Sequence, residues 1–191
     1  MLQKLTTLLF NPFKKYSETI LLAFGIAFTI LGTLLGFYFN ARFDGVLDMH
    51  FVKKAFLETV ALDNLINIAC LFVFLFGVAK FTNTKTRFID ILNTILISRI
   101  AVYLLVFIPT PSEELIQNLM RGNINQVSSL DIFLLATGSI LALIGIVWHI
   151  TLLYNGFKTA SNAKKILPVV LFAVSIFFAE ILSKTLISYF N

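Results

Sequence analysis

Long stretches without charge dominate the sequence. No charged residue occurs between Thr19 and Ala41, and four further apolar runs follow; together they cover about residues 19–39, 63–80, 88–108, 131–154 and 166–190. The hydrocarbon core of a bilayer is about 30 Å thick, which a helix crosses with about 20 residues. Because lipid cannot hydrogen-bond a bare backbone N–H or C=O, such runs must be helical. The sequence therefore predicts five transmembrane helices.

The amino-acid composition supports the same fold class. Hydrophobic residues make up 58% of the 191 residues, charged residues make up 13%, and there are 21 phenylalanines. A soluble domain carries roughly a quarter charged residues, and a small soluble globule could not cover this much apolar side chain with polar surface. The prediction is an all-α polytopic membrane protein. It forms a single transmembrane domain over residues 1–191, with five helices in a bundle and short amphipathic interfacial helices in the two outer connections.

Lysine and arginine are unevenly distributed among the connections, and this distribution predicts the orientation. Nine of them fall in the N-terminal segment and in the connections after the second and fourth runs: Lys4, Lys14, Lys15, Lys80, Lys85, Arg87, Lys158, Lys164 and Lys165. Four fall in the other two connections: Arg42, Lys53, Lys54 and Arg121. We therefore expect the N-terminus in the cytoplasm and the C-terminus outside. This clustering also accounts for the net charge of +5 without a nucleic-acid partner.

The two outer connections are the longer ones. Between His50 and Leu62 the charged residues fall on one side of a helical wheel, which predicts an amphipathic helix in the membrane interface. In the second outer connection, Glu113 and Glu114 suit the first turn of a short helix. The second apolar run is short, and we expect polar residues at its start to lie in the headgroup region and to extend it outward: Asp63, Asn64 and Asn67.

Four ionisable residues fall inside the runs, where a charge costs at least about 2.5 kcal/mol unless it is paired or hydrated. Arg99 lies near the middle of the third run, His149 lies towards the cytoplasmic end of the fourth, and Glu180 and Lys184 are four residues apart on the fifth. Arg99 and Glu180 reach similar depths when residues are counted from the cytoplasmic starts. We predict an Arg99–Glu180 ion pair, with Lys184 as a competing partner. The pair would lock the bundle; alternatively, these charges and His149 would line a polar path.

Small residues recur along one face of the first run, at Gly25, Thr29, Gly32 and Gly36. A stripe of this kind allows two helices to approach closely. The pattern fits contact within the bundle, and it also fits a dimer interface.

No catalytic motif stands out. Serine and histidine form no recognisable arrangement, and His149 has no histidine or cysteine partner at helical spacing. Asp44, Asp48 and His50 could bind a divalent cation, but nothing fixes the geometry of the ligands, so a solvated turn is the expectation. With Cys70 as the one cysteine, neither a disulfide nor a thiolate zinc cluster can form within the chain. We expect no enzyme activity, no metal and no cofactor.

The layout of the chain resembles the Yip domain family, which is named for Ypt-interacting proteins. The resemblance rests on Pro12 before the first run, on Trp148-His149, and on the connection from Gly156-Phe157-Lys158 to Lys164-Lys165. It implies a five-span bundle with a cytoplasmic N-terminus and a membrane-organising role. Eukaryotic members act with Rab-type GTPases and carry a long cytoplasmic N-terminal region. Here about 16 residues precede the first run, which argues against GTPase binding and for a prokaryotic, plasma-membrane version.

These features lead to two functional expectations. The first is a non-enzymatic membrane protein that works through helix contacts, with the lipid bilayer and itself or other membrane proteins as partners. The alternative is a small transporter or channel subunit with a polar path at Arg99, Glu180 and Lys184.

Overall fold

The computed structural model describes residues 2–109, 113–122 and 128–190. It is almost entirely helical. Its elements in chain order are α1 (Leu2–Phe10), η1 (Pro12–Lys14), α2 (Glu18–Tyr38), β1 (Ala41–Arg42), β2 (His50–Phe51), α3 (Leu57–Thr82), α4 (Phe88–Tyr103), η2 (Leu104–Phe107), α5 (Glu113–Met120), α6 (Ser129–Ser161) and α7 (Ile166–Phe190).

Five of these helical segments are long and apolar enough to cross a membrane: Glu18–Tyr38, Leu57–Thr82, Phe88–Phe107, Ser129–Ser161 and Ile166–Phe190. The prediction of five such helices is confirmed, and the third and fifth begin where the sequence placed them. The second begins at Leu57 rather than at residue 63, and the fourth continues to Ser161 rather than ending at residue 154. Both are longer because the helical backbone continues through the polar residues at the ends of the apolar runs.

Helix α4 lies in the middle of the molecule. It packs against α2, α3 and α6. In the most apolar part of Phe88–Phe107, which is α4 together with η2, 72% of the residues are buried, compared with 11% in the most apolar part of α6. Helix α7 packs on α3. A helix that is surrounded by protein can hold polar side chains away from lipid, and α4 carries several buried ones: Asn93, Thr94, Ser98 and Arg99.

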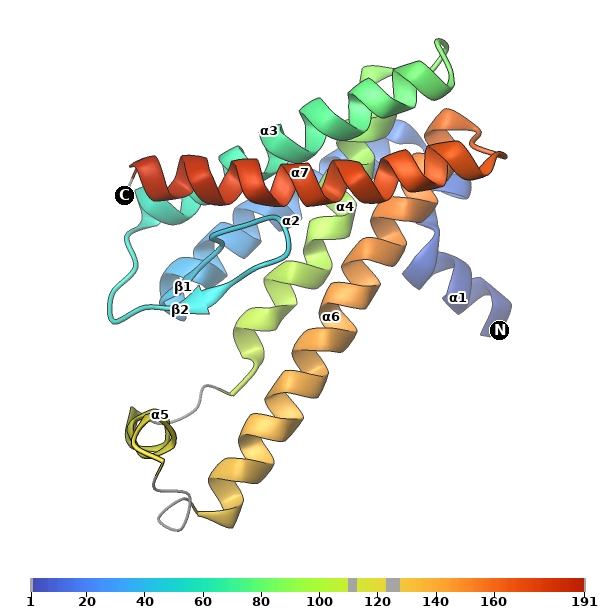
Figure 1. The fold of residues 1–191 in the computed structure, drawn as a ribbon. Helices are drawn as coiled ribbons and strands as arrows, with labels where there is room; N and C mark the ends of the chain where they lie inside the picture. Colours follow the sequence, from blue (N-terminus) through green and yellow to red (C-terminus); the bar gives the residue numbers. More distant parts are fainter. Residues whose placement is uncertain (1, 110–112, 123–127, 191) are drawn as a thin grey trace.

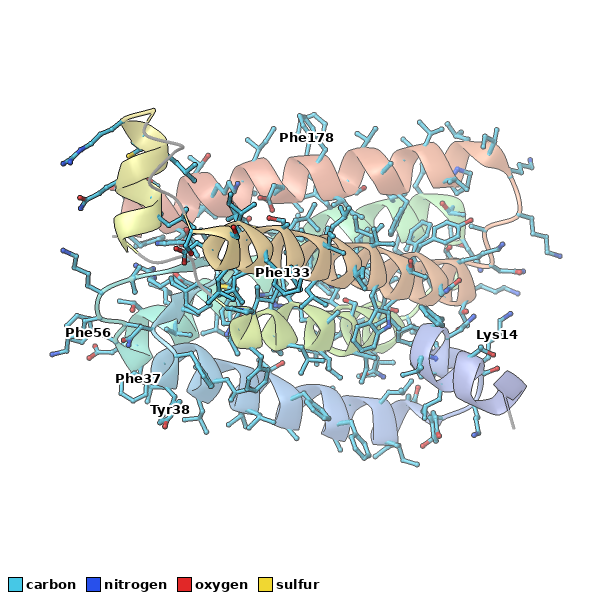
Figure 2. The ribbon with its side chains drawn as sticks, turned by 90° about the horizontal axis from the view of Figure 1, so that it is seen from below. Lys14, Phe37, Tyr38, Phe56, Phe133 and Phe178 are labelled. Atoms are coloured by element: carbon cyan, nitrogen blue, oxygen red, sulfur yellow. The ribbon has the colours of Figure 1, made fainter. Side chains whose placement is uncertain are left out.

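The connections gather at two opposite ends of the molecule. The N-terminus, the α3–α4 turn and the α6–α7 turn lie towards one end, whereas the β1–β2 hairpin, α5 and the C-terminus lie towards the other (Figure 1). Figure 2 shows Lys14 at the end opposite to Phe37, Tyr38 and Phe56. The nine basic residues counted above belong to the segments at the first end. Below, these are called the basic end and the hairpin end.

The connection between α2 and α3 contains a β-hairpin, so the separate amphipathic helix expected between His50 and Leu62 is wrong for residues 50–56, whereas residues 57–62 are helical as the first turns of α3. Strands β1 and β2 pair antiparallel, with Arg42 opposite His50. Asn40 adopts the left-handed conformation (φ 54°), which asparagine tolerates better than most residues, and turns the chain after α2. Its carbonyl accepts the Val52 N–H at 2.8 Å and its Oδ1 accepts the Ala55 N–H at 3.0 Å, so one residue holds both sides of the connection.

Two short helices complete the fold. The helix expected around Glu113 in the second outer connection is present as α5. Helix α1 was not foreseen. It is held against α6 because Trp148 Nε1 donates to the Leu9 carbonyl at 2.7 Å and Asn155 Nδ2 donates to the Phe10 carbonyl at 2.8 Å. These bonds satisfy carbonyl groups that a helix leaves unpaired at its C-terminus.

Candidate functional site

Arg99 is the central feature of a buried polar core. Its side chain comes from α4 and is fully buried (0% exposed). Nη2 donates to Asn64 Oδ1 at 2.9 Å, and Nε donates to the Tyr103 hydroxyl at 3.2 Å. The guanidinium carbon also lies 5.8 Å from the ring centre of Phe43 and 5.4 Å from that of Tyr103, within the range of cation–π contact. An amide, a hydroxyl and two aromatic rings therefore surround this charge.

Asn64 connects three helices. Its Oδ1 accepts from Arg99 on α4, and its Nδ2 donates to the Thr33 hydroxyl on α2 at 3.0 Å. The Thr33 hydroxyl in turn donates to the Thr29 carbonyl at 2.9 Å. Since Asn64 itself lies on α3, this chain of hydrogen bonds fixes α2, α3 and α4 relative to one another.

An ion pair closes the hairpin side of the core. Arg42 Nη2 lies 2.6 Å from Asp63 Oδ1, and its Nε donates to Oδ2 at 2.9 Å, a bidentate geometry. The Asp63 side chain is 2% exposed. This buried carboxylate raises the pKa of Arg42, chiefly through the hydrogen bonds. On the same helix face, Asn67 Nδ2 donates to the Phe43 carbonyl at 2.7 Å, which ties the hairpin loop to α3.

These contacts correct the expectation for the start of the second run. Asp63, Asn64 and Asn67 do not lie at a solvated edge; all three are at most 1% exposed and face the protein interior. Their spacing places Asp63 and Asn67 one helical turn apart on one face. In the sequence, that spacing is the feature that indicates a buried polar cluster.

The predicted Arg99–Glu180 ion pair is wrong. Glu180 Oε1 pairs with Lys184 Nζ at 3.1 Å, and Oε2 accepts the Leu47 N–H at 2.9 Å. Lys184 also pairs with Asp48 at 2.8 Å. Similar depth does not bring Arg99 and Glu180 together, because α7 packs on α3 whereas Arg99 lies on α4.

The hairpin loop over residues 43–47 contacts both Arg99 and Glu180, through different residues. The Phe43 ring lies beside Arg99, and Gly45 approaches Glu180 so closely that a Cβ there would lie 2.5 Å from Oε1. Phe43 and Val46 are 0% exposed. The loop is therefore part of the core, and its glycine is required by the carboxylate beside it.

His149 lies deep in the interface between α4 and α6. It is 0% exposed, and its Nδ1 lies 2.9 Å from the Ser98 carbonyl. Since a carbonyl only accepts, Nδ1 carries the hydrogen. Two buried nitrogens have no hydrogen-bond partner among the described residues, His149 Nε2 and Arg99 Nη1.

The three glycines of the predicted stripe are buried, and Thr29 is half-buried. A Cβ at Gly25 would meet Leu96 Cβ of α4 at 2.6 Å, and one at Gly32 would overlap the Tyr103 ring. A Cβ at Gly36 would lie 2.8 Å from Val60 Cγ1 of α3. The Thr29 hydroxyl donates to the Gly25 carbonyl at 2.8 Å, so it stays on its own helix. The glycines allow α2 to lie directly against α4 and α3.

The acidic and imidazole groups of the hairpin pair with separate partners. Asp44 contacts His50, and Asp48 pairs with Lys184. Partial burial raises the pKa of Asp44. Within the described residues, no group of three His, Cys, Asp or Glu side chains is placed to hold a metal ion.

Four cavities were located, with volumes of about 520, 250, 260 and 340 Å³. None of these four is lined by Arg99, His149, Glu180 or Lys184. The largest lies at the basic end, between the starts of α2 and α4 and the end of α6. The predicted site residues therefore do not line a common cavity among these four.

Compared with known proteins, the chain matches no family model, no curated protein and no solved structure.

Proposed function

We propose that this is an integral membrane protein that crosses the bilayer five times and acts, without enzyme activity, as a membrane-organising scaffold of the Yip type. In this proposal the N-terminus lies in the cytoplasm, the C-terminus lies outside, and the membrane is a bacterial plasma membrane. Five apolar helices support the insertion. The basic segments at one end support the orientation, because cytoplasmic connections carry an excess of lysine and arginine.

The observation that carries the scaffold role is the burial of Arg99. A charged side chain in a transport path has to be reached by water or by the solute, whereas Arg99 is 0% exposed and engages Asn64, Tyr103 and Phe43. Each of these contacts joins α4 to another part of the fold or stiffens α4 itself. The polar core is thus suited to holding the helices and the hairpin in one arrangement.

The outward surface of α6 supports a role in contact. Many large apolar side chains along this helix are exposed: Leu130, Ile132, Phe133, Leu135, Ile140, Leu141, Leu143, Ile144 and Val147. In a bilayer such a surface meets lipid or the helix of another protein. A rigid core with a long apolar flank fits a protein that organises its neighbours within the membrane.

A small transporter is the second candidate, and two atoms favour it. Arg99 Nη1 and His149 Nε2 are buried without a hydrogen-bond partner among the described residues, and intramembrane ionisable groups commonly mark solute pathways. Transport would require water or a solute to reach these atoms from one end.

An experiment in reconstituted vesicles distinguishes the two functions. For the experiment, Cys70 is replaced by alanine, and Lys85→Cys at the α3–α4 turn carries a donor or an acceptor dye. If the protein is a scaffold, we expect energy transfer between labelled copies above the level of random collision. We also expect no protein-dependent flux of K⁺ or protons. Transfer at the random level together with a flux that Arg99→Gln abolishes would replace the scaffold with a transporter.

A pair of matched variants tests the role of α6 in association. Leu143 on α6 and Val73 on α3 are similarly exposed, at 63% and 64%. We expect Leu143→Trp to lower the energy transfer and Val73→Trp to leave it unchanged. Equal effects of the two substitutions would exclude α6 as the contact surface.

A further inference from the structure

A polar cavity of about 520 Å³ lies at the basic end, outside the core described above. Its walls come from the segment that leads into α2, from the first turns of α4, and from the last turns of α6. In a membrane with the proposed orientation, this is the depth of the cytoplasmic headgroups, because α2 and α4 begin here and α6 ends here.

The charged groups of the cavity are three. Arg87 Nη2 pairs with Glu18 Oε2 at 2.7 Å and with Asp90 Oδ1 at 2.8 Å, and Arg87 Nε donates to Asp90 Oδ2 at 3.1 Å. Arg87 Nη1 makes no hydrogen bond or ion pair with a described residue, so its N–H groups can donate to a further anion. Two carboxylates face one guanidinium, which leaves the lining with one net negative charge.

Asn93 supplies an unmet hydrogen-bond acceptor in the wall. The residue is 2% exposed, and its Nδ2 donates to the Glu18 carbonyl at 3.0 Å. Because that carbonyl can only accept, the amide nitrogen must face it, which fixes the orientation of the side chain. The other amide atom, Oδ1, is buried and has no partner among the described residues. A donor group brought by a ligand would satisfy it.

An apolar groove of about 250 Å³ adjoins this cavity. Tyr16 and Leu21 line both spaces. The remaining groove residues come from α1, η1, α2 and α4, and all are apolar: Leu8, Pro12, Ile20, Phe24, Ile97 and Ile100. A polar cavity with both charge signs therefore continues into a slot for hydrocarbon, at the level where a bilayer changes from headgroup to acyl chain.

We propose that these two spaces together bind one phospholipid whose headgroup carries a primary ammonium, as in phosphatidylethanolamine. The ammonium donates to Asn93 Oδ1 and meets the carboxylates of Glu18 and Asp90, the phosphate meets Arg87, and an acyl chain occupies the groove. An anionic headgroup such as glycerol phosphate is disfavoured by the two carboxylates. A choline headgroup has no N–H donor for Asn93. The inference rests on the proposed membrane insertion and is independent of the scaffold role.

Competition among three lipids tests the proposal. Delipidated full-length protein in detergent is mixed with equal amounts of phosphatidylethanolamine, phosphatidylcholine and phosphatidylglycerol that carry identical acyl chains, and the retained lipid is measured by native mass spectrometry. We expect about tenfold more phosphatidylethanolamine adduct than either competitor, the scale of one charge-assisted hydrogen bond. Equal retention of the three lipids, or a preference for phosphatidylglycerol, would overturn the proposal.

Variants locate the binding. Glu18→Gln alters an exposed side chain and should reduce the preference to near parity. Arg87→Gln removes the phosphate contact that the three lipids share, and Ile100→Trp fills the groove, so each should reduce the retention of all three lipids. At the hairpin end, Glu58→Gln and Lys53→Gln are matched controls and should keep the preference. A preference that survives Glu18→Gln would refute this site.

Free phosphoethanolamine distinguishes a lipid site from a site for a soluble headgroup. We expect it to displace the lipid only at far higher concentration, because it lacks the acyl chain. Displacement at equal concentration would contradict a lipid ligand. Lipid retention is measured on single copies, so its outcome is separate from that of the energy-transfer experiment.

Discussion

At the scale of single residues, the hydrogen-bond partners of Arg99 among the described residues are neutral groups. The guanidinium bonds to Asn64 and Tyr103 and has no ion pair among the described residues. Arg42, nearer the hairpin end, instead has a bidentate carboxylate in Asp63. A buried charge without a counter-charge depends strongly on each hydrogen bond it makes, because removing a partner leaves the charge desolvated and unpaired.

The first prediction compares the two sides of the Arg99–Asn64 bond. Asn64→Leu should destabilise the fold by about 3 kcal/mol, because it leaves the Arg99 charge with one bond fewer in an apolar site. Arg99→Met should cost less, since it removes the charge together with its desolvation and takes a donor only from two neutral groups, the Asn64 amide oxygen and the Tyr103 hydroxyl. Reversible unfolding in detergent micelles measures both, and a larger loss for Arg99→Met would refute this description of the core.

The second prediction concerns the Arg42–Asp63 pair. Arg42→Met should destabilise the fold by about 3–5 kcal/mol, because Asp63 is then buried without its partner. Replacing both residues, Arg42→Met with Asp63→Leu, should recover most of that loss, since no unpaired charge remains. Unfolding of the two single variants and the double variant gives the coupling energy. Strictly additive losses would mean that the pair does not interact.

At the scale of elements, close contacts decide how α2 and the hairpin loop pack. Gly25 and Gly32 bring α2 against Leu96 and Tyr103 of α4. Gly45 brings the loop against Glu180 of α7. In each case the glycine leaves room for a side chain of the neighbouring element to lie directly against the backbone, which is how small residues allow close packing.

The third prediction uses a matched pair of glycines. Gly32→Ala should destabilise the fold by about 1–3 kcal/mol, because the added methyl group overlaps the Tyr103 ring. Gly77→Ala should be neutral or stabilising, because no atom lies within 4 Å of a Cβ there and alanine favours the helix. Unfolding in micelles tests both. Equal losses would show that helix propensity, and not the contact with α4, governs these sites.

The fourth prediction tests the insertion of the hairpin loop. In a background without Cys70, a cysteine at Val46 should resist alkylation by a soluble maleimide, because Val46 is 0% exposed. Gly45→Val should raise the labelling rate at least tenfold by forcing the loop away from Glu180. As a control, a cysteine at exposed Asp48 should react quickly in both backgrounds. Rapid labelling at Val46 without Gly45→Val would contradict the buried loop.

At the scale of the whole molecule, the sequence predicted what length and apolarity determine. Five helices follow from five apolar runs, and α7 occupies the residues expected for it. The hairpin was not predictable from periodicity, because each strand has two residues and the turn depends on the left-handed backbone of Asn40. The charged residues from β2 to the first turns of α3 are spaced as they would be on one side of a single amphipathic helix, which is why the sequence predicted a helix there.

The polar core was predicted in part. The sequence indicates that Arg99 is an intramembrane charge and predicts a carboxylate as its partner, whereas the structure supplies an amide and a tyrosine. Tyr103 lies four residues after Arg99, a spacing that places both on one helix face and could have indicated the contact. No rule of sequence spacing identifies Asn64, because its contact joins residues 35 positions apart and depends on how α3 packs on α4.

The proposed function requires that the five helices cross a bilayer with the basic end and the hairpin end on opposite sides. Single cysteines at Thr84, in the α3–α4 turn, and at Lys53, beyond the hairpin, test this in cells that express a variant without Cys70. A membrane-impermeant maleimide should label Lys53→Cys in intact cells and Thr84→Cys only after permeabilisation. Labelling of both positions from the same side, or recovery of the protein in the soluble fraction, would contradict the account.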